Sequence, residues 1–292
     1  MSGCSLVLVD EPCDTDTATV DETGAPPELL FLAAATGATH TCGILDDATL
    51  LCWGLGDEGQ LDAPDGPFDM LSAGHAHTCA IDASGETFCW GRNDHGQTEL
   101  SGDFVSVSAG GAHSCGLDAA GSVTCVGRND VGQADVPAHA FLSISAGEKH
   151  TCGIVSLEDG NTGSVCWGEL KKEAVFGEAH TRVISGSNWA CTDAPSGMDC
   201  FDGSGERDLD VPDGVVSGST ILGGHHGCGL TSDESILCWG EGESGQKDAP
   251  GGAYAKLFSG PTSLHTCALH SGEEEAAPLT CWGLDAENQL TP

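Results

Sequence analysis

The chain repeats one sequence motif seven times. Its fullest copy reads AGHAHTCAIDASGETFCWGRNDHGQ over residues 73–97. The first cysteine of each copy recurs after steps of 36 to 39 residues, at Cys42, Cys79, Cys115, Cys152, Cys191, Cys228 and Cys267. Self-similarity at such a period is typical of identical small units stacked on one another. The pattern therefore predicts one repeat domain over residues 28–292, preceded by an N-terminal tail over residues 1–27.

Each repeat predicts a small antiparallel sheet. The segments FVSVS at 104–108 and FLSIS at 141–145 alternate apolar and small polar residues, which is the period of a half-buried strand. A second strand follows as HTCAID or HSCGLD, then a short turn, then a third strand that ends in CWG or CVG. Helical periodicity is hard to find along the chain, so the predicted fold class is all-β.

Every leading cysteine has a second cysteine 9 to 14 residues later. Directly opposed residues of two antiparallel strands have Cα atoms about 4.5 to 5.5 Å apart, which suits a disulfide. We therefore predict one hairpin disulfide per repeat. The separation of 9 in the fifth repeat predicts an even turn centred on Pro195 and Ser196. The predicted pairs are Cys42–Cys52, Cys79–Cys89, Cys115–Cys125, Cys152–Cys166, Cys191–Cys200, Cys228–Cys238 and Cys267–Cys281.

The rival interpretation makes each cysteine pair a metal site together with the histidine two residues before the leading cysteine. In the fifth repeat Trp189 replaces that histidine while both cysteines remain, and no fourth ligand recurs at a fixed spacing. We therefore expect disulfides and no bound metal at these positions. Because disulfides persist in oxidising compartments, the expected location is secreted, periplasmic or on the cell surface.

The charge balance limits the partners. The chain has 45 acidic and 9 basic residues, a net charge of -36, and such a field repels the phosphates of nucleic acids. Carboxylates gather at 14–22 and 202–210. Calcium prefers such oxygen ligands, but neither segment has the spacing of an EF-hand loop. No apolar run is long enough to predict a membrane span. We expect no cofactor, with calcium kept as an alternative.

The N-terminus has two open interpretations. Ser2, Gly3 and Cys4 match the end of a bacterial lipoprotein signal, which makes Cys4 a candidate lipid anchor. Alternatively, Cys4 and Cys13 form an eighth disulfide. Residues 14–27 are acidic and rich in threonine, as in a solvated tether.

Three sequence signatures, GxxHTC, CWGxNxxGQ and a following proline as in VGQADVP at 131–137, resemble repeats of the regulator of chromosome condensation superfamily. The resemblance covers residues 31–292 and is strongest to the bacterial branch, typified by β-lactamase inhibitory protein II. It implies a seven-bladed β-propeller, closed into a ring, with short blades of three to four strands. The hairpin cysteines are an addition to that family pattern, and the resemblance carries no partner.

Two recurring positions are interpreted as structural. We predict that the repeated histidines hydrogen-bond within their own repeat rather than bind a metal: His40, His77, His113, His150, His226 and His265. We predict that the tryptophans of the CWG motifs pack between neighbouring blades: Trp53, Trp90, Trp167, Trp239 and Trp282.

Repeats four and five depart from the pattern, and five of the nine basic residues lie there: Lys149, Lys171, Lys172, Arg182 and Arg207. We predict a contact surface in this sector formed by Trp189, Phe201, Lys171, Lys172 and Arg182.

No catalytic motif such as GxSxG or HExxH occurs. The favoured function is a non-enzymatic binding module on the bacterial exterior that recognises a protein or glycan through one propeller face. One alternative is a secreted hydrolase or lyase with carboxylates at the channel mouth, and another is a self-assembling structural or adhesive surface protein.

Overall fold

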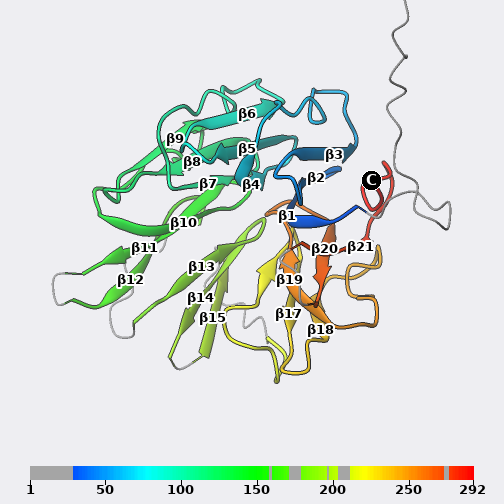
Figure 1. Ribbon diagram of the computed structural model, residues 1–292. Coiled ribbons are helices and arrows are strands. Elements are labelled where there is room, and N and C mark those ends of the chain that lie inside the picture. Colours follow the sequence, from blue (N-terminus) through cyan, green and yellow to red (C-terminus); the bar gives the residue numbers. More distant parts are fainter. Residues whose placement is uncertain (1–28, 158–159, 171–178, 196, 203–210, 273–275) are drawn as a thin grey trace, which may run out of the picture.

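The computed structural model describes residues 29–157, 160–170, 179–195, 197–202, 211–272 and 276–292. In these ranges the chain forms strands β1 to β21 and no helix. The strands make seven antiparallel sheets of three consecutive strands each. Figure 1 shows the sheets in chain order around a common centre, from blue to red. The predicted seven-bladed propeller is confirmed, with three strands in every blade.

Within each blade the three strands have constant places. The first strands are β1 Phe31–Thr36, β4 Phe68–Ala73, β7 Ser106–Ala109, β10 Phe141–Ala146, β13 Arg182–Ser185, β16 Ile221–Leu222 and β19 Tyr254–Phe258. The middle strands are β2 His40–Leu45, β5 His77–Asp82, β8 His113–Leu117, β11 His150–Ser156, β14 Trp189–Ala194, β17 His226–Leu230 and β20 His265–His270. The third strands are β3 Leu50–Gly54, β6 Thr87–Gly91, β9 Val123–Gly127, β12 Thr162–Gly168, β15 Gly197–Asp202, β18 Ile236–Gly240 and β21 Leu279–Gly283.

A disulfide joins the middle and third strands of every blade, as predicted. In blade 2, Cys79 lies directly opposite Cys89 in the β5–β6 register, with Cα atoms 4.1 Å apart. The other six pairs have Cα separations of 4.0 to 4.1 Å. In blade 5 the last pairing joins Ala194 and Gly197, so the turn has the even length expected from the sequence. Cys4 and Cys13 lie outside the described residues.

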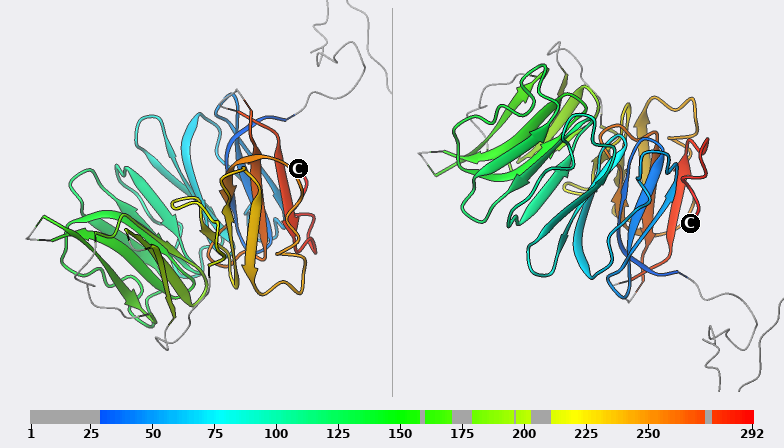
Figure 2. Two further views of the ribbon diagram at one scale, coloured as in Figure 1. Left: turned by 90° about the horizontal axis from the view of Figure 1, so that it is seen from below. Right: turned by 90° about the horizontal axis from the view of Figure 1, so that it is seen from above.

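The ring closes between the last blade and the first. Phe31 and Ala277 exchange two backbone hydrogen bonds of 2.9 and 3.0 Å. The indole Nε1 of Trp53 donates to the backbone oxygen of Gln289 at 2.9 Å. Both views of Figure 2 place the first blade, in blue, beside the last, in orange to red. The C-terminal segment therefore completes the packing of blade 1.

Five of the six repeated histidines bond through Nε2 to the next blade, which corrects the prediction that each ring bonds within its own repeat. His265 also has a bond within its repeat, since its Nδ1 lies 3.1 Å from Ser263 Oγ. His77 Nε2 lies 2.8 Å from Ser114 Oγ, and that hydroxyl donates to the backbone oxygen of Gln97 at 2.8 Å. Because the hydroxyl proton is used, Nε2–H must be the donor. Burial lowers the pKa of His77 to about 3, which favours the neutral ring. The same inter-blade pair recurs as His40–Thr78, His113–Thr151, His226–Thr266 and His265–Thr41.

Tryptophans of the CWG motifs also pack between blades, as predicted. Trp90 Nε1 donates to the backbone oxygen of Gln60 at 2.9 Å, and Trp282 Nε1 donates to that of Gln246 at 3.0 Å. Each glutamine comes from the loop that enters the blade from its predecessor. Its side chain holds that loop, since Gln60 Oε1 accepts from the amide of Glu58 at 2.8 Å. In these loops the glutamine therefore couples two neighbouring blades.

Candidate functional site

The first strands of all seven blades line a central channel. It encloses about 230 Å³ between small side chains such as Ala73, Ser108 and Ser145. Among the described residues that line it, Arg182 is the charged side chain and no carboxylate takes part. A pair of acids of the kind that a glycoside hydrolase uses is thus absent from the described lining of the channel.

The structure does not place the two predicted aromatic contact residues at the surface. Trp189 is 2% exposed, and its Nε1 donates to the backbone oxygen of Gly224 in the next blade at 3.1 Å. Phe201 is 8% exposed and packs in a core cluster with Val183 and Ala190. Trp189 replaces the inter-blade histidine of the other repeats. Its departure from the pattern is therefore accommodated by packing, and the expected aromatic patch is not formed.

Of the three basic residues of the predicted contact surface, Arg182 is the one within the described residues. Arg182 Nη1 donates to the backbone oxygen of Gly218 at 2.8 Å and lies 4.0 Å from Asp193 Oδ2. Burial lowers the pKa of Arg182, while Asp193 opposes that shift. Lys171 and Lys172 lie outside the described residues, as do the calcium candidates at 14–22 and nearly all of 202–210.

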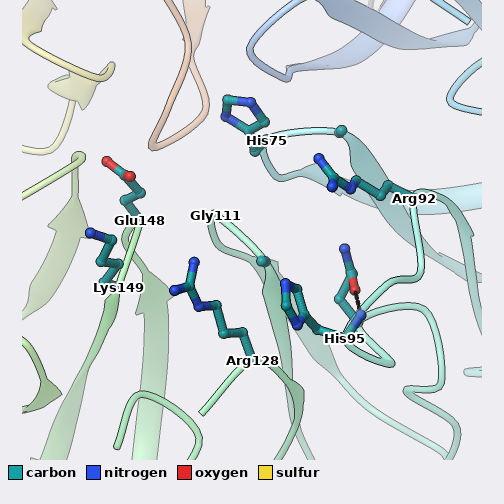
Figure 3. A pocket seen from close by; sticks show the side chains of 10 residues that line it. His75, Arg92, His95, Gly111, Arg128, Glu148 and Lys149 are labelled. Atoms are coloured by element: carbon teal, nitrogen blue, oxygen red, sulfur yellow. Dashed lines mark hydrogen bonds between the residues drawn. The ribbon is translucent and has the colours of Figure 1, made fainter. Parts of the chain in front are cut away.

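Another pocket opens between blades 2, 3 and 4, at the end of the ring where the first strands end. It encloses about 230 Å³, and its charged and imidazole side chains are His75, Arg92, His95, Arg128, Glu148 and Lys149. We call it the arginine pocket. Figure 3 shows Arg92, Arg128 and His95 arranged around the loop at Gly111. Three of the nine basic residues of a chain with net charge -36 meet here.

A repeated GRND segment positions the two arginines. Gly91 ends β6 with a φ of +96°, and a Cβ there would lie 2.6 Å from the backbone oxygen of Ala76. This close approach lets the amide of Arg92 donate to the same oxygen at 2.9 Å. In blade 3 the amide of Arg128 donates to Ala112 at 2.8 Å in the same way. Both arginines are therefore fixed at the backbone.

Aspartates two residues further on orient the guanidinium groups. Arg92 Nε donates to Asp94 Oδ2 at 2.6 Å, and Arg128 Nε donates to Asp130 Oδ2 at 2.9 Å. The hydrogen bond to Asp94 raises the pKa of Arg92, and the hydrogen bond from Arg128 lowers the pKa of Asp130. These interactions favour the charged forms of Arg92 and Asp130.

Gly111 lies where the loops of blades 3 and 4 approach each other at the arginine pocket. Gly111 occupies the repeat position of His75 in blade 2 and Glu148 in blade 4. A Cβ at Gly111 would lie 2.4 Å from the backbone oxygen of Glu148, so the loops of blades 3 and 4 can only approach this closely with glycine here.

The acidic member of the pocket is held by the following blade. Glu148 Oε2 accepts a hydrogen bond of 2.9 Å from Ser187 Oγ. Lys149 Nζ lies 4.0 Å from Glu169 Oε2, and both side chains are exposed. In Figure 3 Glu148 and Lys149 lie on the opposite side of the Gly111 loop from Arg92 and His95. The pocket therefore has two arginines at its centre and a more neutral edge toward blade 4.

The predicted site residues do not include Arg92, Arg128, His75 or His95, and Lys149 is predicted only as one of the basic residues of repeats four and five. The signal was the GRND segment, which stands at residues 91–94 and again at 127–130. Among the described residues, no three His, Cys, Asp or Glu side chains gather as a metal site would require. Nor does this part of the chain contain a helix long and apolar enough to cross a membrane.

Comparison with known proteins agrees with the fold. Residues 33–60, 71–97 and 104–133 match the regulator of chromosome condensation repeat. No curated protein sequence matches the chain. The ectodomain of the receptor kinase CR4 from Physcomitrella patens is 25% identical, with a TM-score of 0.71 over 87% of this chain and 73% of its own.

Two further solved structures share the fold. The CRINKLY WD40 ectodomain of the Arabidopsis thaliana receptor kinase ACR4 is 24% identical, with a TM-score of 0.71 over 91% of this chain and 99% of its own. Human WBSCR16 is 16% identical, with a TM-score of 0.63 over 78% of this chain and 83% of its own. At these identities the similarity shows a shared propeller fold and does not indicate what this chain binds.

Proposed function

Because the chain carries regulator of chromosome condensation repeats folded as a disulfide-linked propeller, we propose that it is an extracellular binding module that holds a protein partner. The contact is made through the face on which the arginine pocket opens. Loops on a rigid scaffold are the usual carriers of binding residues. The observation that carries the proposal is the meeting of three of nine basic residues in one pocket of a chain with net charge -36.

Two observations support the extracellular location. Seven disulfides, one in each blade, persist only where the surroundings are oxidising. The fold is also that of a receptor-kinase ectodomain to which the chain is 25% identical.

On a bacterial surface, a lipid on Cys4 would tether the module. The mass of the N-terminal peptide tests this, because a lipid adds mass and a disulfide to Cys13 does not.

Partner capture tests the function. Wild-type protein, immobilised and exposed to the extracellular fluid of its source, is compared with the variant Arg92→Ala/Arg128→Ala. The matched control is Lys247→Ala/Lys256→Ala, which removes two exposed positive charges from blades 6 and 7. We expect a protein that wild type and the control retain and the arginine variant loses. Equal retention by all three, or retention of a glycan alone, would contradict the proposal.

A further inference from the structure

The guanidinium groups of the arginine pocket use one edge within the protein. Arg92 is engaged by Asp94 through Nε and Nη2, and Arg128 is engaged by Asp130 through the same two atoms. A guanidinium has five N–H donors, and within the described part of the chain no hydrogen bond involves Nη1 of either arginine. The aspartates therefore hold both groups in place and leave the second edge of each available.

The pocket has room at this edge. Gly111, Ala76 and Ala112 contribute its small residues. Figure 3 shows Arg92 extending toward His75 and Arg128 extending toward the Gly111 loop from its other side. The amide hydrogen bond of each arginine holds its backbone, and the aspartate holds its guanidinium group. Little ordering of the side chains is therefore needed when a ligand binds. Each free guanidinium edge suits a small planar anion.

The surroundings of the pocket restrict what can carry that anion. Asp94, Glu99 and Asp130 are exposed on the same loops, and the whole chain has a net charge of -36. A polyanion that reached the arginines would bring its other charges against these carboxylates and would be repelled. A single anionic group flanked by neutral or basic groups avoids this repulsion. Basic flanking groups are in addition attracted by the same carboxylates.

We propose that the arginine pocket binds one carboxylate, from an aspartate or glutamate in a segment of the partner protein whose neighbouring residues are neutral or basic. The inference rests on the proposed function and specifies its ligand chemistry. The carboxylate meets the free edge of Arg92 or of Arg128, each of which can present two parallel N–H donors. Lysine supplies the charge but not the fork, so it does not replace arginine here.

Two synthetic peptides test the chemistry, acetyl-KKGDGKK-amide and acetyl-KKGNGKK-amide, which differ by one carboxylate. Titration calorimetry at fixed ionic strength is done with wild type, Arg92→Lys/Arg128→Lys and the control Lys247→Ala/Lys256→Ala. We expect wild type and control to bind the aspartate peptide about tenfold more tightly than the asparagine peptide, as for a charge-assisted bidentate contact. In the lysine variant the ratio should fall below about threefold, because charge remains and the fork is lost.

Equal affinity of wild type for both peptides would overturn the inference, since it would show attraction of basic peptides by the acidic surface alone. A sulfated disaccharide is titrated in parallel. Arginine-dependent binding of this sugar without a preference for the aspartate peptide would assign the pocket to an anionic glycan and also overturn it. Near-UV circular dichroism and the count of free thiols establish that each variant is folded.

The two proposals fail separately. If partner capture depends on Arg92 and Arg128 but the peptides are not distinguished, the carboxylate inference falls and the binding module stands. If neither capture nor peptide binding changes in the arginine variants, both fall.

Discussion

The Nε2 atom of His113 lies 2.8 Å from the Oγ1 atom of Thr151, which joins blade 3 to blade 4 through a fully buried pair of side chains. The threonine hydroxyl in turn donates to the backbone oxygen of Gln133 at 3.1 Å. Three groups from two blades are thereby satisfied by one another. Such pairs recur around the ring, so the blades are coupled by polar contacts as well as by apolar packing.

Removing the hydroxyl should weaken one blade interface. In Thr151→Val the shape is kept, but His113 Nε2 loses its acceptor in a buried place. We expect a loss of about 1 to 3 kcal/mol in the free energy of unfolding, the usual result of leaving a buried donor unsatisfied. Denaturant titration measures it, and a stability equal to that of wild type would show that the pair contributes nothing.

The opposite change should strengthen another interface. His150 Nε2 is buried without a partner among the described residues, and Ala190 occupies the position where blades 1 to 4 and 7 have serine or threonine. Ala190→Ser supplies a hydroxyl, and we expect a gain of about 1 kcal/mol by denaturant titration. In the control Gly43→Ser, a Cβ would lie 2.5 Å from the Phe31 ring, and destabilisation is expected. A loss of stability in Ala190→Ser would contradict the assignment.

Stability should fall as the pH decreases from 7 to 5. Burial is the main cause that lowers the pKa of His77 to about 3 and that of His113 to about 4, and His40, His150, His226 and His265 are shifted likewise. The ordinary value is about 6.5, so the unfolded chain binds more protons in this range and acid favours unfolding.

Denaturant titrations at several pH values measure this effect. The slope of the unfolding free energy against pH measures how many more protons the unfolded chain binds than the folded one. In His77→Asn this number should be smaller than in wild type by about one, because one shifted group is gone. A wild-type stability that does not change between pH 7 and 5 would contradict the neutral, buried state of these rings.

The disulfides should account for much of the stability. In Cys79→Ala/Cys89→Ala one hairpin link is lost, and we expect a loss of about 2 to 3 kcal/mol, the chain-entropy value for a loop of this size. Alkylation followed by mass spectrometry should find the fourteen cysteines of the seven pairs protected in the native protein. Free thiols at most of these positions would overturn the extracellular assignment.

Gly91 should tolerate no side chain. Its φ is +96°, and a Cβ would lie 2.6 Å from the backbone oxygen of Ala76. Gly85 is a matched control, with a φ of +91° and nothing within 4 Å of its Cβ position. Both alanine variants carry the backbone strain of positive φ, so thermal unfolding should show a larger loss in Gly91→Ala. Equal losses would mean that the close approach is relieved without cost.

Salt should raise the temperature of unfolding. The net charge of -36 repels itself in the compact state, and this repulsion is screened as ionic strength increases. Over the range from about 0.05 to 1 M sodium chloride the Debye length falls from more than 10 Å to about 3 Å. Calorimetry over this range measures the shift of the unfolding temperature. A transition temperature that does not change with salt would contradict the argument.

Local geometry explains why much of the fold could be predicted. The pairing of Cys79 with Cys89 and the even turn between Ala194 and Gly197 depend only on residues of one hairpin, whose register is visible in the spacing of the chain. The histidines could not be assigned in this way. His77 and Ser114 are 37 residues apart, and the sequence of one repeat does not say which surface of the next repeat it will meet.

By itself the sequence determined the number of units, the strands within each and the cross-strand sulfur bonds, because all of these follow from contacts within a single blade. Tertiary structure alone decided that Trp189 is buried and that Arg92 and Arg128 share a pocket with Lys149. Burial and charge clustering depend on how neighbouring blades pack around the ring axis, and residues that lie at the same level in successive blades become neighbours only when the ring has formed.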